Sequence, residues 1–147
     1  MAKKASQIRV FLLDDHEVVR LGIAELINAE ADLHVVGDHG HADGAVDAAL
    51  SAKPDVAVLD VRLGDGTGIE VCRDIRSADP DIACLMLTSF ADDHAMVDAS
   101  MAGAAGYVLK EIRSNELTDS IRKVAGGALL LDAAEVRLSL DRLRNSD

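Results

Sequence analysis

The chain has 147 residues, of which 49% are hydrophobic and 2% aromatic, and its formal net charge is −11 at pH 7. This length fits one domain with a real hydrophobic core, and the composition means that Val, Leu, Ile and Ala must build that core. The negative charge argues against binding of DNA, RNA or an anionic membrane surface by this chain, since such ligands are held by Lys and Arg, but it is compatible with a cation site.

Apolar runs and helical patterns alternate five times along the chain. The predicted strands are residues 8–13, 33–37, 55–60, 82–88 and 106–110; the predicted helices are residues 16–30, 42–52, 69–78, 92–102 and a fifth that starts near Ser114 and ends before Gly126. Several strands are continuous apolar runs, which is typical of parallel strands covered by helices on both faces. The sequence therefore predicts an α/β fold, a doubly wound five-stranded parallel sheet.

Polar side chains stand at the carboxyl ends of four of these strands. Asp14 and Asp15 follow the first strand, Asp60 ends the third, Thr88 ends the fourth, and Lys110 ends the fifth. Functional crevices of open parallel sheets lie outside the carboxyl ends of the strands, so these groups are expected to share one edge.

The chemistry of this set points to a divalent cation and phosphoryl transfer. Three crowded carboxylates repel one another unless a cation lies among them, and oxygen ligands suit Mg²⁺. A carboxylate beside that ion, such as Asp60, is also a possible nucleophile toward a phosphoryl group. The Lys110 ammonium and the Thr88 hydroxyl could then bind phosphoryl oxygens.

A glycine-rich loop follows Asp60. Gly64, Gly66 and Gly68 are expected to leave room above that carboxylate and to permit a positive φ. Thr67 is expected to cap the helix that comes next.

These residues resemble a known family. Residues 8–126 look like the receiver domain of two-component response regulators, and the segments FLLDDHEVVRLGIAELI, DVRLGDGTGIEVCRDIR and GAAGYVLK resemble its NarL/FixJ-type subfamily in particular. The resemblance implies that Asp60 accepts a phosphoryl group from a sensor histidine kinase. It further implies that Asp15, Asp60 and the backbone carbonyl of Arg62 hold Mg²⁺, with Asp14 in support.

The resemblance also implies a switch. Thr88 and Lys110 would bind the phosphoryl oxygens, and Tyr107 occupies the position of the aromatic residue that turns inward together with the threonine. Independently of the family, a phosphoryl group adds charge and strong acceptors, so movement of Thr88 toward it would vacate space for Tyr107. The face around residues 92–103 would then be rearranged.

The sequence departs from the family pattern in the loops around the site. Gly64 stands where the family usually has proline, and Glu111 stands where many receivers have a cis proline. Arg62 and Phe90 occupy positions that influence the rate of dephosphorylation in receivers.

Residues 127–147 form a separate segment. Val136, Leu140 and Leu143 share a helical stripe, which predicts an amphipathic linker helix that packs on the receiver's own surface or on a second copy; the alternative is a frayed polar end. The family plan places a DNA-binding domain after such a linker, and none is present in this chain. We expect either a fragment of a longer transcriptional regulator or a stand-alone receiver, and a homodimer.

The cysteines and histidines are not expected to take part in the site. Cys72 and Cys84 lack metal-site spacing and are expected to be reduced core thiols. The five histidines show no ligand spacing and are read as surface or loop residues: His16, His34, His39, His41 and His94.

No signal peptide or membrane span is predicted, and a cytoplasmic chain is expected. A phosphatase of the haloacid-dehalogenase type would need an acid at position 62, which is Arg62. We expect a binding and switch module rather than a turnover enzyme, one that catalyses its own phosphorylation and hydrolyses its own phosphoryl group. A pseudo-receiver that dimerises without phosphate is the alternative.

Overall fold

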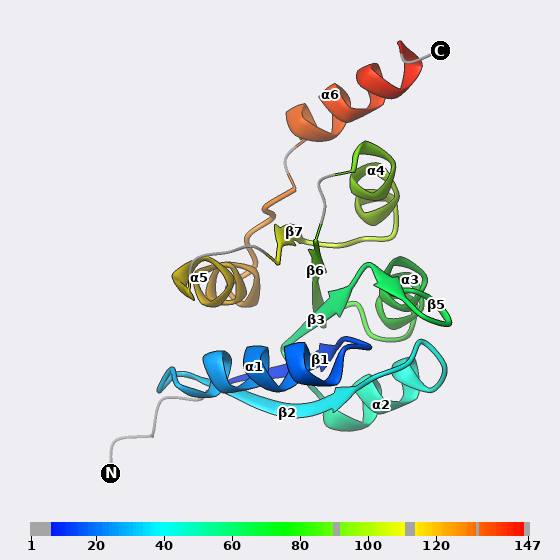
Figure 1. The fold of residues 1–147 in the computed structure, drawn as a ribbon. Coiled ribbons are helices and arrows are strands. Elements are labelled where there is room, and N and C mark those ends of the chain that lie inside the picture. The colour runs from blue at the N-terminus through cyan, green and yellow to red at the C-terminus, as the bar shows by residue number, and fades with distance from the viewer. Residues whose placement is uncertain (1–6, 90–91, 111–113, 132, 146–147) are drawn as a thin grey trace.

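A computed structural model describes residues 7–89, 92–110, 114–131 and 133–145 of the chain (Figure 1). Within these ranges one five-stranded sheet has the order β2-β1-β3-β6-β7, and every adjacent pair of strands is parallel. Its strands are β1 (Ile8–Leu13), β2 (Leu33–His39), β3 (Val56–Asp60), β6 (Ala83–Thr88) and β7 (Gly106–Leu109). The predicted fold class is confirmed.

Helices cover both faces of this sheet (Figure 1). The described helices are α1 (Glu17–Asn28), α2 (Ala45–Ala52), α3 (Gly68–Ala78), α4 (Asp93–Met101), α5 (Ser114–Ala125) and α6 (Ala133–Arg144). One core cluster joins the sheet to α1 and α5, and a second joins it to α2, α3 and α4. Both clusters consist mainly of aliphatic side chains, as the composition requires.

Among the element boundaries that differ from the predicted ones, two have a clear local cause. β2 continues to His39, because its last residues keep pairing with β1, His39 opposite Leu13. α2 starts at Ala45 rather than at residue 42, because Gly44 precedes it with φ of +79° and the Asp65 carboxylate accepts the backbone N–H groups of the two residues before that glycine. A short hairpin, β4 (Arg62–Leu63) with β5 (Gly66–Thr67), was not predicted and follows β3 directly.

α6 packs against α4, on the same molecule (Figure 1). Ser139 is fully buried in this contact, and its hydroxyl lies 3.4 Å from Met96 Sδ. Arg142 binds both carboxylate oxygens of Asp93 at 2.9 Å. Val136 and Leu140 are half-buried, so the apolar stripe packs on the receiver's own surface. The alternative prediction of a frayed polar end is wrong. Among the helices that the structure describes, none combines the length and the apolar character needed to span a bilayer.

Candidate functional site

The predicted site residues meet at the carboxyl edge of the sheet. Asp60 is the last residue of β3 and Thr88 the last residue of β6, while Asp14 and Lys110 directly follow β1 and β7. Asp14, Asp60 and Thr88 are buried, at 0%, 4% and 3% exposure. Strand pairing fixes these positions, because each side chain sits on backbone that is hydrogen-bonded into the sheet.

Lys110 joins the two buried carboxylates. Its Nζ donates to Asp60 Oδ2 at 2.9 Å and forms an ion pair with Asp14 Oδ2 at 3.1 Å. Burial raises the pKa of Asp60 above its ordinary value, although Lys110 opposes that rise. Burial also works to lower the pKa of Lys110, but pairing with Asp60 and Asp14 outweighs it and the pKa rises. One cation thus compensates two carboxylates only in part.

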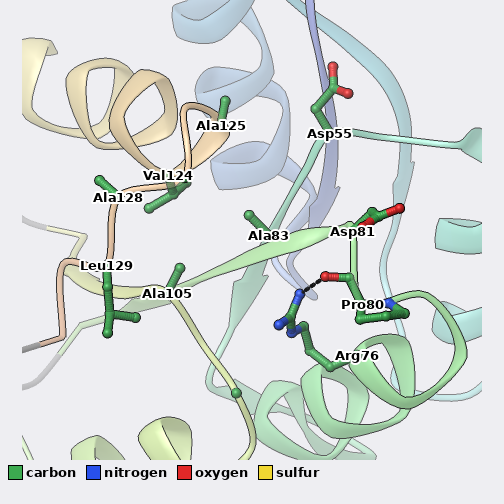
Figure 2. Close-up of a pocket in the computed structure, with 12 residues that line it drawn as sticks. Asp55, Arg76, Pro80, Asp81, Ala83, Ala105, Val124, Ala125, Ala128 and Leu129 are labelled. Carbon is green, nitrogen blue, oxygen red and sulfur yellow. Dashed lines mark hydrogen bonds between the residues drawn. The ribbon is translucent and has the colours of Figure 1, made fainter.

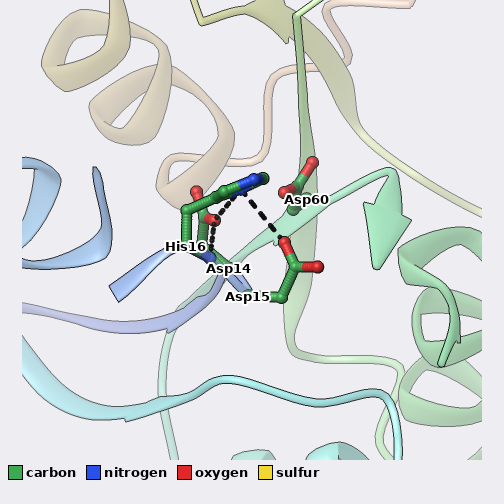
Figure 3. A group of neighbouring side chains, drawn as sticks. All are labelled: Asp14, Asp15, His16 and Asp60. Carbon is green, nitrogen blue, oxygen red and sulfur yellow. Dashed lines mark hydrogen bonds and ion pairs between the residues drawn. The ribbon is translucent and has the colours of Figure 1, made fainter. Parts of the chain in front are cut away.

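A third carboxylate and an imidazole complete a cluster beside this pair. Asp15 Oδ2 accepts the backbone N–H of Gly64 at 2.8 Å. Asp15 Oδ1 is buried and accepts no aligned hydrogen bond within the described residues, although His16 Nδ1 lies 3.1 Å away. Figure 3 shows the His16 ring over the carboxylates of Asp14 and Asp15, with Asp60 opposite.

This cluster fits a divalent cation. Asp14, Asp15, His16 and Asp60 each offer one ligand atom, and these atoms lie within 4.8 Å of one another. Buried carboxylate oxygens that lack hydrogen-bond donors are suited to a hard cation such as Mg²⁺, which takes oxygen ligands.

The glycine loop acts through close backbone contact. Gly68 N–H donates to Val61 O at 2.9 Å, and a Cβ at Gly68 would lie 2.0 Å from the carbonyl oxygen of Asp60. The expected positive φ is wrong for Gly64, Gly66 and Gly68, since the described glycines with positive φ are elsewhere. The Thr67 cap is confirmed: its hydroxyl accepts the Glu70 N–H at 3.2 Å.

A pocket of about 170 Å³ opens onto Asp60. Its lining residues are His16, Asp60, Arg62, Thr88, Ser89 and Lys110. Thr88 is therefore a wall of the space above the carboxylate. Tyr107 is half-buried behind it; burial raises the pKa of the Tyr107 phenol, and a hydrogen bond with Thr88 acts in the opposite direction.

Arg62 links the hairpin after Asp60 to α4. Its side chain is 70% exposed and lies 3.3 Å from the carboxylate of Asp92, which caps α4 by accepting the N–H groups of His94 and Ala95. The backbone N–H of Arg62 points to Asp60 Oδ1 at 3.4 Å. Phe90 and Glu111, singled out in the sequence, lie outside the described residues.

Comparison with known proteins identifies the family of this chain. The model of the response regulator receiver domain family matches residues 10–122. The chain belongs to the response regulator receiver domain family. Within this family, DNA-binding transcriptional activator DevR/DosR of Mycobacterium tuberculosis is 49% identical over 139 residues, which are 95% of this chain and 64% of that protein.

Further matches agree with the NarL/FixJ-type assignment. Transcriptional regulatory protein LiaR of Bacillus subtilis is 37% identical over 143 residues, which are 95% of this chain and 66% of that protein. This chain thus spans slightly less than two thirds of each of these two relatives. A LuxR-family response regulator from Aurantimonas sp. SI85-9A1 superposes with a TM-score of 0.82 at 30% identity, covering 95% of this chain and 99% of that one. The predicted family and subfamily are confirmed.

One residue that lies at this site, His16, was not predicted to belong to it. His16 was read as a surface histidine, and its side chain is indeed 68% exposed, but its Nδ1 reaches Asp15 at 3.1 Å and Asp14 at 3.5 Å. Its place directly after the acidic pair was the available signal. The prediction that Cys72 and Cys84 lie in the core is confirmed, because both are buried there.

A larger pocket of about 380 Å³ lies at the opposite edge of the receiver sheet (Figure 2). Two of the charged side chains that line it, Asp55 and Arg76, bind the chain's own backbone. Asp55 accepts the backbone N–H of Arg9 at 2.9 Å, and the Arg76 guanidinium donates to the carbonyl oxygens of Pro80 and Ile82. This edge holds none of the predicted site residues.

Proposed function

We propose that this chain is a phosphorylatable switch in which Asp60 accepts a phosphoryl group from a sensor histidine kinase. The observation that carries the proposal is the buried Asp60 carboxylate, 2.9 Å from Lys110 Nζ, at the floor of a pocket walled by Thr88. An oxygen of Asp60 attacks phosphorus, and the P–N bond to the kinase imidazole breaks with its electron pair left on nitrogen. The product is an aspartyl phosphate.

The chain's residues divide the work of this transfer. Lys110 neutralises charge on a phosphoryl oxygen, and Thr88 donates its hydroxyl to another. Mg²⁺, when bound, would neutralise further phosphoryl charge, and the residues that would hold it are Asp14, Asp15, Asp60 and the backbone carbonyl of Arg62. Phosphorylation is expected to require the ion, because three carboxylates otherwise repel an incoming phosphate.

The same geometry supports a switch. Thr88 shares a hydrogen bond with Tyr107. A phosphoryl group that takes the Thr88 hydroxyl would end this bond and release Tyr107 to a new position. α4 lies over this part of the sheet and carries α6, so the change would reach the surface that α6 covers.

The wider role follows the family. We propose residues 8–126 as the receiver domain and residues 127–147 as the linker helix and tail. The switch would change homodimerisation and control transcription through a DNA-binding domain outside this chain, in the cytoplasm. The chain would not act as a turnover enzyme on other substrates, and hydrolysis of its own aspartyl phosphate would reset it.

Intact-mass spectrometry after incubation with acetyl phosphate and Mg²⁺ tests the central step. Wild-type protein should gain one phosphoryl group, which hydroxylamine removes, and Asp60→Asn should gain none. Asp65→Asn is the matched control, since Asp65 lies in the same loop but its carboxylate accepts backbone N–H groups of Ala42 and Asp43. Absence of an adduct on wild-type protein that binds Mg²⁺ would favour the phosphate-independent pseudo-receiver.

A further inference from the structure

We propose that His16 supplies a nitrogen ligand to the acidic cluster, so that this site binds a borderline transition-metal dication, such as Zn²⁺ or Cu²⁺, through an interaction that Mg²⁺ does not use. The inference rests on the proposed cation site and adds a ligand and a metal class to it. Three observations support it: where the backbone places the imidazole, what the ring faces, and what donor set results.

The backbone places His16 at the entrance of the site. His16 precedes α1 in an extended conformation, and its N–H donates to Asp14 Oδ1 at 2.9 Å. Its carbonyl accepts the Arg20 N–H at 2.8 Å. Residues at this position of a helix usually cap it with their side chain, but the His16 side chain makes no such hydrogen bond. The imidazole ring therefore makes no capping hydrogen bond to α1.

The ring is directed at the carboxylates (Figure 3). Nδ1 lies 3.1 Å from Asp15 Oδ1 and 3.5 Å from Asp14 Oδ1. Asp15 Oδ1 is buried and without an aligned hydrogen bond. Opposite ligands of a small octahedral cation stand about 4 Å apart. The four ligand atoms of Asp14, Asp15, His16 and Asp60 already lie within 4.8 Å of one another, so modest side-chain movement would close them on one ion.

The donor set then decides the metal class. Carboxylates and a backbone carbonyl suit Mg²⁺, whereas imidazole suits Zn²⁺ and other later transition metals. Because Mg²⁺ gains little from a nitrogen ligand, His16 should contribute to one class of metal and not to the other. The contribution of an exposed side chain should also be modest, because ordering it costs rotamer entropy.

Isothermal titration of the full chain with Zn²⁺ and, separately, with Mg²⁺ tests the proposal on wild-type protein, His16→Ala and His41→Ala. We expect His16→Ala to weaken Zn²⁺ about tenfold while leaving Mg²⁺ affinity within about twofold. His41→Ala is the matched control, since His41 is an exposed loop histidine whose ring instead lies beside that of His39, 6.1 Å away between ring centres. It should leave both affinities at the Asp15-dependent site unchanged, and Asp15→Asn should weaken both metals there.

Pulsed electron paramagnetic resonance of bound Cu²⁺ gives a readout that does not depend on affinity. Wild-type protein should show modulation from a coordinated imidazole nitrogen, and His16→Ala, with circular dichroism matching that of wild-type, should lack it. Equal Zn²⁺ affinities together with no nitrogen modulation would overturn the role of His16 and leave the proposed Mg²⁺ site standing. Failure of wild-type protein to bind either metal would overturn both proposals.

Discussion

The pocket around Asp60 and the contact between α4 and α6 are held together in different ways. In the pocket, Asp14 and Asp60 are buried side chains on paired strands, and the neighbouring strand residues are fully buried. In the α4–α6 contact, Ser139 is the fully buried residue of α6 among those described, and an ion pair between exposed side chains, Arg142 and Asp93, closes the edge.

The pocket is thus suited to the proposed phosphoryl transfer, and the α4–α6 contact is suited to transmitting its effect to the surface. Groups that must neutralise a phosphoryl oxygen need fixed positions, which hydrogen-bonded strands provide. A helix held by little buried apolar surface can leave at small cost in free energy, so a local rearrangement beneath it can be transmitted. Substitutions in the pocket should therefore change global stability far more than substitutions in the α4–α6 contact.

The largest effect is expected at Gly68, where the backbone after Asp60 leaves no room for a side chain. Gly68→Ala would put a Cβ 2.0 Å from the backbone oxygen of Asp60, and backbone cannot give way as a flexible side chain can. We expect a loss of about 3 kcal/mol or more in the free energy of unfolding, measured by urea denaturation.

Gly22→Ala is its control. Gly22 lies within α1 and an added Cβ meets nothing within 4 Å, so the substitution should stabilise the protein by about 0.5–1 kcal/mol. Similar effects for the two alanine variants would show that the loop is no more rigid than the surface of α1.

Removing the shared cation of the pocket should come next. Lys110→Met leaves Asp14 and Asp60 without their common partner, and we expect a loss of about 3 kcal/mol by urea denaturation with EDTA present. Adding Asp60→Asn to this variant should recover part of the loss, because one uncompensated carboxylate is gone. A loss well under 1 kcal/mol would mean that the pocket is solvated rather than dry.

Neutralising Asp60, the proposed phosphoacceptor, should stabilise the protein, with a defined dependence on pH. The pKa of Asp60 is raised by folding, so its ionisation starts to cost stability as the pH rises past the ordinary aspartate value and costs it in full above the folded value. Asp60→Asn should therefore raise the free energy of unfolding at pH 7 by on the order of 1 kcal/mol. The gain should shrink as the pH falls and should vanish below about pH 3.8, the ordinary pKa of aspartate, since wild-type Asp60 is then protonated in both states. A gain that is constant with pH would contradict this cause.

Breaking the edge of the α4–α6 contact should change local opening more than global stability. Arg142→Ala removes two charge-assisted hydrogen bonds to Asp93, both between exposed groups, so the urea midpoint should barely move. Hydrogen exchange of the backbone amides in residues 133–144 should become several-fold faster. Arg144→Ala, at an exposed arginine of the same helix, is the control and should leave exchange unchanged.

The smallest effect is expected at the centre of that contact. Ser139 is buried, and its hydroxyl donates to the weak acceptor Met96 Sδ at 3.4 Å and accepts a long hydrogen bond from Arg142 Nη2, also at 3.4 Å. Ser139→Ala should change stability by no more than about 0.5 kcal/mol in urea denaturation. A loss above 1.5 kcal/mol would place α6 with the rigid part of the molecule and remove the contrast between the two regions.

The sequence predicted the pocket because its residues stand where strands end. Apolar runs located those ends, and parallel pairing required Asp14, Asp60, Thr88 and Lys110 to share an edge whatever the side-chain details. The longer β2 was missed because its last residues, including His39, are polar and continue the strand only through pairing with β1.

The sequence pattern does not determine where a side chain points or on which surface a helix packs. The stripe of α6 would look the same whether it packed on α4 or on another chain. His16 faces the carboxylates only because its side chain does not cap α1, which composition does not reveal. The glycines after Asp60 were expected to leave room above its carboxylate, but Gly68 instead allows close approach to the backbone oxygen of Asp60, and none of the three has a positive φ.

Tyr107 gives this molecule an optical label in the place where one is most useful. The sequence has one tyrosine and no tryptophan. The near-ultraviolet absorption and emission of the chain therefore come almost entirely from the phenol that shares a hydrogen bond with Thr88. Emission intensity and anisotropy of the unlabelled, unmutated protein can follow that one ring in real time, from addition of a phosphodonor to the return of the resting signal.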